Sequence, residues 1–256
     1  ELLQVYLQEG KIAEANNLLD SLFEYYPTDR ELLYTLANIQ FKNQDWPNLL
    51  QTYKNIYVQD RDNTDILIKI YEIGIVTGNE TIVLGLLQEL QSEEEGPLII
   101  ELLVELLSGM GDYDDAIAYH LNLIELDGET EKRIISLGEL YLLNEQFIDV
   151  TTTIDPLYQG GEYTLEILRL LLIAYSNLEN TEKQIQISET LMEKYPELPI
   201  GYEALSFAYL EGGQESKAVN ILHDSIEIFP LEVNFPYTLA TIYYRSGNYH
   251  QAEKYF

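Results

Sequence analysis

The sequence contains no cysteine, which excludes a disulfide framework, a thiolate metal site and a cysteine nucleophile. Histidine is also scarce, because only His120, His223 and His250 are present, and none has a second histidine one helical turn away. Paired histidines at that spacing are a common source of metal ligands on a helix. The sequence therefore predicts no metal site, and nothing in it indicates a cofactor.

Long hydrophobic runs and basic residues are also lacking. No stretch approaches the roughly 20 apolar residues that span a bilayer, so we expect no direct membrane insertion. Lys and Arg total 14 against 44 Asp and Glu, for a formal net charge of -30. A field of this sign repels the phosphates of DNA and RNA, which excludes a nucleic-acid partner, and it opposes docking on anionic lipid.

The absence of cysteine also bears on the cellular compartment. A chain without cysteine is compatible with the cytoplasm, where thiols stay reduced, and we expect a cytoplasmic protein. The sequence opens on Glu1-Leu2-Leu3-Gln4, which is neither a start methionine nor a signal peptide. A targeting segment outside this chain remains an alternative.

The acidic residues are unevenly distributed. Residues 70–131 contain no Lys or Arg and fifteen acids: Glu72, Glu80, Glu89, Glu93, Glu94, Glu95, Glu101, Glu105, Asp112, Asp114, Asp115, Glu125, Asp127, Glu129 and Glu131. One interpretation is a solvated helical face that keeps the protein soluble. The other is attraction of a basic partner, since long-range fields accelerate association at low salt.

A fixed interval organises the rest of the chain. The spacing is 34 residues between Tyr141, Tyr175, Tyr209 and Tyr243, and it recurs for Gly213 and Gly247, for Ala218 and Ala252, and for Pro196 and Pro230. A period of this size indicates one supersecondary element copied along the sequence. Because each copy packs only on its neighbours, such an array offers a long surface for binding.

Each copy predicts two helices. Ile134, Leu137, Gly138 and Tyr141 fall on one helical face, a break such as Gly247-Asn248 follows, and a second helical pattern completes the copy. Alternation with a period of two is nowhere sustained, so we predict an all-α fold without a sheet. The copies are expected at residues 1–29, 30–63, 64–96, 97–130, 131–164, 165–198, 199–232 and 233–256.

The pattern resembles the tetratricopeptide repeat (TPR) family. The resemblance is strongest in Tyr202-Glu203-Ala204-Leu205-Ser206-Phe207-Ala208-Tyr209 followed by Gly213, Ala218, Leu222 and Pro230, and in the turn Gly111-Asp112-Tyr113-Asp114-Asp115-Ala116. It covers residues 1–256 as about seven and a half tandem copies of one solenoid. The resemblance implies a right-handed superhelical solenoid of antiparallel helix pairs. It also assigns the periodic tyrosines and alanines to the core.

Several positions depart from the pattern. Gly74 replaces the expected large aromatic residue, and Val83 replaces the expected small one. Pro156, followed by Gly160-Gly161, predicts a shortened or kinked helix. The acidic run Glu93-Glu94-Glu95-Gly96-Pro97 marks a register slip. The last copy stops at Phe256 within its second helix, which indicates a fragment of a longer chain or an uncapped end able to self-associate.

We predict no enzyme, because the sequence has no Gly-x-Ser-x-Gly and no phosphate-binding glycine spacing. The resemblance implies that first helices line a concave groove that binds segments of other proteins. The partner-binding residues would be Tyr34, Asn38, Phe41, Glu72, Glu101, Glu105, Glu139, Arg169, Glu203, Phe207, Tyr237, Thr241 and Tyr244. The family's carboxylate clamp is absent, since Tyr34 occupies the position of its lysine.

The first hypothesis is therefore a non-catalytic protein–protein interaction scaffold. It would bind a basic or amphipathic peptide or helix in an acidic groove with aromatic ends. The alternative is a regulatory or substrate-presenting arm of a larger enzyme or of a secretion or assembly complex.

Overall fold

The computed structural model describes residues 2, 5, 6, 9, 11–26, 28–93 and 96–256. All regular structure in these residues is helical and no strand occurs in them, so the predicted all-α fold is confirmed. The helices are α2 (Ile12–Tyr25), α3 (Arg30–Lys42), α4 (Trp46–Gln59), α5 (Thr64–Thr77), α6 (Glu80–Glu93), α7 (Pro97–Met110), α8 (Tyr113–Asp127), α9 (Glu131–Leu143), α10 (Phe147–Gln159), α11 (Leu165–Asn177), α12 (Thr181–Lys194), α13 (Ile200–Glu211), α14 (Glu215–Ile228), α15 (Asn234–Arg245) and α16 (Tyr249–Tyr255).

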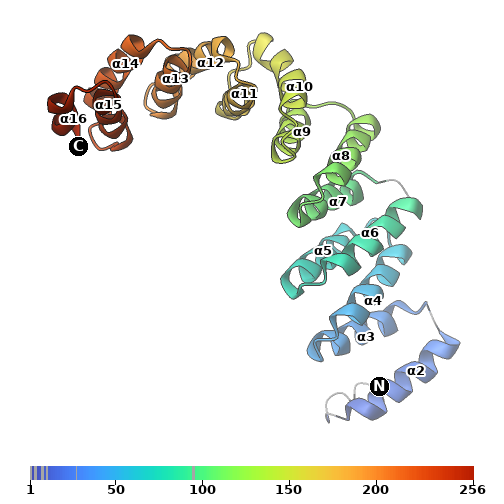
Figure 1. Cartoon of the computed structure of the whole chain (residues 1–256). Helices are drawn as coiled ribbons and strands as arrows, with labels where there is room; N and C mark the ends of the chain where they lie inside the picture. The colour runs from blue at the N-terminus through green and yellow to red at the C-terminus, as the bar shows by residue number, and fades with distance from the viewer. Residues whose placement is uncertain (1, 3–4, 7–8, 10, 27, 94–95) are drawn as a thin grey trace. The chain divides into compact units, whose positions relative to one another are not determined.

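The contacts divide the chain into two compact units. Unit 1 is Glu1–Tyr119 and unit 2 is His120–Phe256, so the boundary falls inside α8. Within unit 1 each helix from α3 to α7 packs on the helix before it, and within unit 2 the same holds from α10 to α16 (Figure 1). This sequential packing of neighbouring helices is the arrangement that a short repeat produces.

A left-handed residue separates the two helices of each pair. Gly78 and Gly111 take φ of 69° and 84° at the ends of α5 and α7. Glycine adopts this conformation without a Cβ penalty, which is why it terminates helices so often. The equivalent positions in three other pairs hold Gln44, Glu145 and Glu179, also with positive φ. The turn is therefore kept even where the glycine is not.

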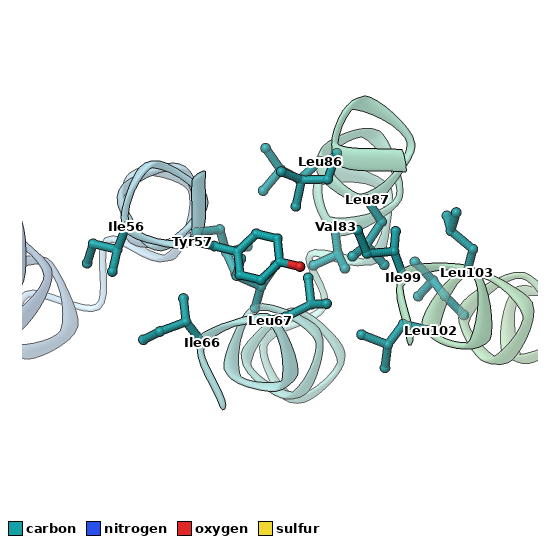
Figure 2. Close-up of a cluster of buried hydrophobic side chains, with 14 of the residues drawn as sticks. Ile56, Tyr57, Ile66, Leu67, Val83, Leu86, Leu87, Ile99, Leu102 and Leu103 are labelled. Atoms are coloured by element: carbon teal, nitrogen blue, oxygen red, sulfur yellow. The ribbon is translucent and has the colours of Figure 1, made fainter. Parts of the chain in front are cut away.

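The core of unit 1 lies between successive helices. Apolar side chains from α4, α5, α6 and α7 converge in one cluster (Figure 2). Its buried members include Ile56, Tyr57, Ile66, Leu67, Val83, Leu86, Leu87, Ile99, Leu102 and Leu103. Because every helix contributes to the contact with its neighbours, burial of these side chains holds the stack together.

Unit 2 has an equivalent core in two clusters. One gathers side chains of α10, α11 and α12 around Ile154, Leu171 and Leu191. The other joins α13, α14 and α15 around Leu222 and Phe235. Both leave the outward faces of the first helices uncovered, and these faces carry the predicted binding residues.

The periodic small and large residues occupy the positions expected of them. Ala15, Ala116, Ala218 and Ala252 are all buried early in a second helix. Tyr175 is also buried, whereas Tyr141, Tyr209 and Tyr243 are half-buried. The ring of Tyr209 lies 5.1 Å from the ammonium of Lys217, which covers part of it. The periodic tyrosines therefore pack within the array and are not its exposed aromatic residues.

Pro156, where the sequence predicts a shortened or kinked helix, does not end its helix. Helix α10 continues to Gln159 and has 13 residues, as many as α9 and α11. Beyond the proline, the Gly160 amide donates to the Pro156 carbonyl at 2.9 Å. Ile154 and Tyr158 flank the proline and are both buried in the core of unit 2. Tertiary packing therefore holds a helix that local propensity disfavours. Of the acidic run at residues 93–97, Glu94 and Glu95 lie outside the described residues.

Candidate functional site

The first helices of the pairs carry all the predicted binding residues. They are α3, α5 and α7 in unit 1, and α9, α11, α13 and α15 in unit 2. The side chains of these residues are exposed except for Glu203 and Thr241, which are half-buried.

Helix α3 of unit 1 presents an aromatic face. The Arg30 guanidinium lies 5.8 Å from the centroid of the Tyr34 ring and pairs with the Asp60 carboxylate at 2.7 Å. Hydrogen bonding to Tyr34 and to Asp60 raises the pKa of Arg30, so this cation stays charged. The Phe41 ring meets the Trp46 ring edge-on, with centroids 5.6 Å apart. Asn38 lies between these two groups along the helix.

Helices α5 and α7 of unit 1 carry the acidic surface. Glu72, Glu101 and Glu105 are exposed there. Glu105 also lines a cavity of about 600 Å³ together with Tyr71, Ile75, Glu80, Thr81, Leu106, Gly109 and Met110. Burial raises the pKa of Tyr71 to about 12, and the charge of Glu105 and a hydrogen bond to it act in the same direction. The Tyr71 hydroxyl on α5 and the Glu105 carboxylate on α7 therefore interact with one another.

This arrangement predicts the titration of Tyr71. By NMR with tyrosine labelled at Cζ, the Tyr71 resonance should titrate near pH 12, and the Glu105→Gln variant should lower that midpoint while burial keeps it above 10. Because the folded-state pKa is raised, unit 1 keeps this contribution to stability below pH 10 and loses it as the pH rises from 10 to 12. The Tyr71→Phe variant assigns the resonance. A midpoint unchanged by Glu105→Gln would contradict the contact.

The N-terminal part of unit 2 continues the acidic character. On α9, Glu139 lines a cavity of about 590 Å³ with Thr130, Glu131, Lys132, Ile135, Ser136 and Glu166. Three carboxylates and one ammonium thus share this depression. Arg169 is exposed on α11 and is the one basic residue among those predicted to bind.

A second cavity in unit 2 brings Glu203 and Phe207 together. It has a volume of about 470 Å³ and lies between α11, α13 and α15. Its lining consists of Leu172, Ile173, Ser176, Asn177, Gln184, Ile200, Glu203, Ala204, Ser206, Phe207, Leu210, Leu222, Asn234, Phe235 and Thr238. The Asn234 side-chain amide donates to the Glu203 carboxylate at 3.1 Å, so the acid is held in place from the neighbouring helix.

Helix α15 ends the series with aromatic residues. Tyr237 meets Phe256 edge-on, with ring centroids 5.8 Å apart, and Tyr244 meets Tyr249 at 5.4 Å. All four rings are exposed. The hydroxyl of Thr241 donates to the Tyr237 carbonyl one turn earlier at 2.9 Å.

Several lining residues were not predicted from the sequence. Ile173 stands 34 residues before Phe207 and occupies the equivalent place on α11, so the period itself could have indicated it. Gln184 lies on a second helix, at a position that the repeat pattern reserves for a small residue. Tyr71 precedes Glu72 on α5 and interacts with Glu105 on α7, the first helix of the next pair. Nothing in the period indicates these last two roles.

Neither a candidate metal site nor a membrane-spanning helix occurs among the described residues. No group of three or more His, Asp or Glu side chains in them could hold a metal ion. No helix among them is long and apolar enough to cross a membrane.

The fold and part of the sequence match known proteins. A solved structure of the C-terminal part of a TPR repeat-containing protein from Cytophaga hutchinsonii is similar, with a TM-score of 0.64 at 13% identity, over 87% of this chain and 92% of that one. The family model described as tetratricopeptide repeat matches residues 100–134. Residues 100–134 are therefore similar to the tetratricopeptide repeat family, and the chain shares the fold of a TPR repeat-containing protein. The matched segment runs from α7 through α8 into α9.

Other TPR-like structures agree on the fold. MamA from Desulfovibrio magneticus RS-1 has a TM-score of 0.55 at 18% identity, covering 65% of this chain and 95% of that one. A chain in the structure of Naa15/Naa10 bound to HypK has a TM-score of 0.61 at 10% identity, covering 99% of this chain and 56% of that one. No curated protein sequence matches the chain. A TPR scaffold implies protein–protein interaction, and the fold is typically non-catalytic.

Proposed function

We propose that this TPR-like protein is a non-catalytic scaffold that binds a basic or amphipathic segment of a partner protein on the first helices of its repeats. The observation that carries the proposal is the composition of those helix faces. Their exposed positions hold carboxylates on α5, α7 and α9 and aromatic rings on α3, α13 and α15. Carboxylates attract Lys and Arg, and aromatic rings supply apolar contact that the partner can bury.

The acidic residues favour a cationic partner. Glu72, Glu101 and Glu105 lie within the interval that contains no Lys or Arg, so few neighbouring cations in the sequence offset their charge. The exposed ion pairs formed with a partner would each contribute about 0–1 kcal/mol. The acids would therefore accelerate association and select the partner more than they would tighten the complex.

The aromatic residues favour an amphipathic partner. The side chains of Phe41, Phe207 and Tyr237 are 51%, 54% and 65% exposed, which is unusual for large apolar rings. Truncation of such anchors typically costs an interface more than 1 kcal/mol each, whereas peripheral contacts cost little. A helix or extended segment with both apolar and basic side chains satisfies both parts of the surface.

The test uses a synthetic helical peptide with leucines along one face and arginines along the other. Its affinity should fall as the salt concentration is raised, because salt screens the attraction between the carboxylates and the arginines of the peptide. The double variant Glu72→Lys/Glu139→Lys should bind about tenfold more weakly at low salt, since two attractions become repulsions. Fluorescence anisotropy of the labelled peptide measures both effects.

The matched control reverses two exposed acids on second helices, Glu125→Lys/Glu189→Lys, which changes net charge equally. This control should retain most of the affinity. A counterpart peptide with glutamates in place of the arginines should not bind. Equal losses in the two double variants, or an affinity independent of salt, would show that these first-helix faces are not the binding surface.

A further inference from the structure

The cavity between α11, α13 and α15 has features of a specific anchor. We propose that it takes one long basic side chain, an arginine or lysine of the bound segment, with the cationic head held by Glu203 and Gln184. This inference rests on the proposed function and adds where, and by which chemistry, the segment is fixed. It concerns unit 2 alone, since every lining residue belongs to that unit.

Gln184 supplies the first observation. This residue is only 2% exposed, and its side chain lines the cavity. The amide Nε2 donates to the Tyr175 carbonyl at 3.2 Å, which assigns the orientation of the amide. The Oε1 atom accepts no hydrogen bond from the described residues. Because Gln184 lines the cavity, this acceptor can receive a hydrogen bond from an N–H group that enters it.

The repeat makes this glutamine unusual. The positions 34 residues before and after it hold Val150 and Ala218, both buried and both apolar. In those copies the site is filled by hydrocarbon that makes no hydrogen bond. At Gln184 the same place in the fold presents a polar acceptor to the cavity, which packing alone does not require.

Glu203 supplies the second observation. It is the one charged residue in the lining, and it forms no ion pair within the described part of the chain. Asn234 donates to its Oε1 at 3.1 Å, which orients the carboxylate without neutralising it. The Ser206 hydroxyl donates to the Glu203 main-chain carbonyl at 2.8 Å and further fixes this turn of α13. The cavity therefore has an oriented negative charge and no Lys or Arg in its lining.

The apolar part of the lining fits the stem of such a side chain. Ile173 and Phe207 are exposed at the surface, and Leu210 is half-buried beside them. Lys and Arg place their methylene stems along apolar surface while the charged head reaches a polar partner. A volume of about 470 Å³ accommodates one such side chain. A purely apolar side chain would leave both the Glu203 charge and the Gln184 acceptor unpaired.

The test uses N-acetylarginine amide as the probe and N-acetylcitrulline amide as its neutral counterpart of the same shape. Addition of the arginine probe to the isotopically labelled full chain should shift NMR resonances of α11, α13 and α15. Citrulline should bind about tenfold more weakly, because it lacks the charge that pairs with Glu203. Glu203→Gln should weaken the arginine probe about tenfold, since the amide still accepts from Asn234 but carries no charge.

Two further variants distinguish binding in this cavity from a general attraction of the probe to the acidic protein surface. Glu211→Gln removes one exposed charge from the same helix outside the cavity and should leave probe affinity unchanged. Gln184→Val introduces the residue of the preceding copy and should weaken the probe about threefold or more while preserving the fold. If Gln184→Val fails to fold, Glu203→Gln with its Glu211→Gln control still decides the question.

Equal binding of arginine and citrulline, or equal effects of Glu203→Gln and Glu211→Gln, would overturn the anchor. The outcomes also separate the two proposals. If the leucine–arginine peptide binds and responds to Glu72→Lys/Glu139→Lys but not to Glu203→Gln, the scaffold stands and the anchor falls. If that peptide does not bind at all, the proposed function falls.

Discussion

Replacing Gly74 with alanine is expected to destabilise unit 1, and a second change, Val83→Ala, is expected to cost less in that background than it costs alone. A Cβ built on Gly74 would lie 2.0 Å from Cγ2 of Val83 and 3.2 Å from its Cβ. Real Cβ atoms do not approach that closely, so α5 and α6 would have to separate or Val83 would have to leave its rotamer. Figure 2 shows Val83 between these two helices, inside the core of unit 1.

The magnitudes follow from packing. Overfilling this contact should cost about 1–3 kcal/mol for Gly74→Ala alone. Val83→Ala alone removes two buried methyl groups and should cost about 1–2 kcal/mol through lost burial and a residual cavity. In the double variant the added methyl group occupies part of the vacated space, so the two losses should not add, and a coupling of about 1 kcal/mol or more is expected.

Urea unfolding of the four proteins in the double-mutant cycle, with hydrogen exchange to locate the effect in unit 1, measures this coupling. The matched control pairs Gly74→Ala with Val150→Ala, which lies at the equivalent position of unit 2. That pair shares no contact, so its losses should add within about 0.5 kcal/mol. Simple additivity for Gly74 and Val83 would show that the two residues do not fill one another's space.

This pair shows what the sequence can and cannot predict. The period identified Gly74 and Val83 as the residues that break the pattern, one too small and one too large. It could not show that the two departures compensate, because that depends on the distance between α5 and α6. The period did predict the helix pairs and the buried alanines, since each of these needs only local spacing and neighbour packing.

Pro156 illustrates the opposite kind of error. Local chemistry predicts a shortened or kinked helix there, because proline lacks an N–H group and clashes with the preceding turn. The helix persists since Ile154 and Tyr158 are buried on either side of it. Tertiary packing thus outweighs a strong local preference, and a sequence read without contacts cannot weigh the two.

In the candidate site, too, the sequence could predict some residues and not others. Glu203 and Phe207 could be predicted, because they occupy exposed first-helix positions that the repeat leaves free to vary. Gln184 could not, since second-helix positions of this kind pack inside the array in every other copy. Its role appears only when its side-chain amide, held by the Tyr175 carbonyl, is placed in the cavity that Glu203 lines. Contacts between helices, rather than the period, therefore define the chemistry of this surface.

Two glycine-to-alanine changes are expected to have opposite signs. Gly201 lies in the first turn of α13, where an added Cβ would come within 2.9 Å of the Met192 backbone nitrogen and 3.1 Å of the Leu191 Cβ. A backbone atom cannot rotate away, so α12 and α13 would have to separate, at a cost of about 1–3 kcal/mol in unit 2. Gly85 lies inside α6 with no heavy atom within 4 Å of the added Cβ. There alanine should stabilise unit 1 by about 0.5–1 kcal/mol through helix propensity.

Thermal unfolding followed by hydrogen exchange tests both changes, because exchange assigns each effect to its unit and a repeat array need not unfold in one step. Exchange should accelerate in α12 and α13 for Gly201→Ala and slow in α6 for Gly85→Ala. The separation of α12 and α13 should also displace Glu203, two residues beyond Gly201, and weaken the arginine probe. Stabilisation by Gly201→Ala would mean that α12 and α13 can separate without loss of stability. Close packing of these two helices would then not determine the position of Glu203.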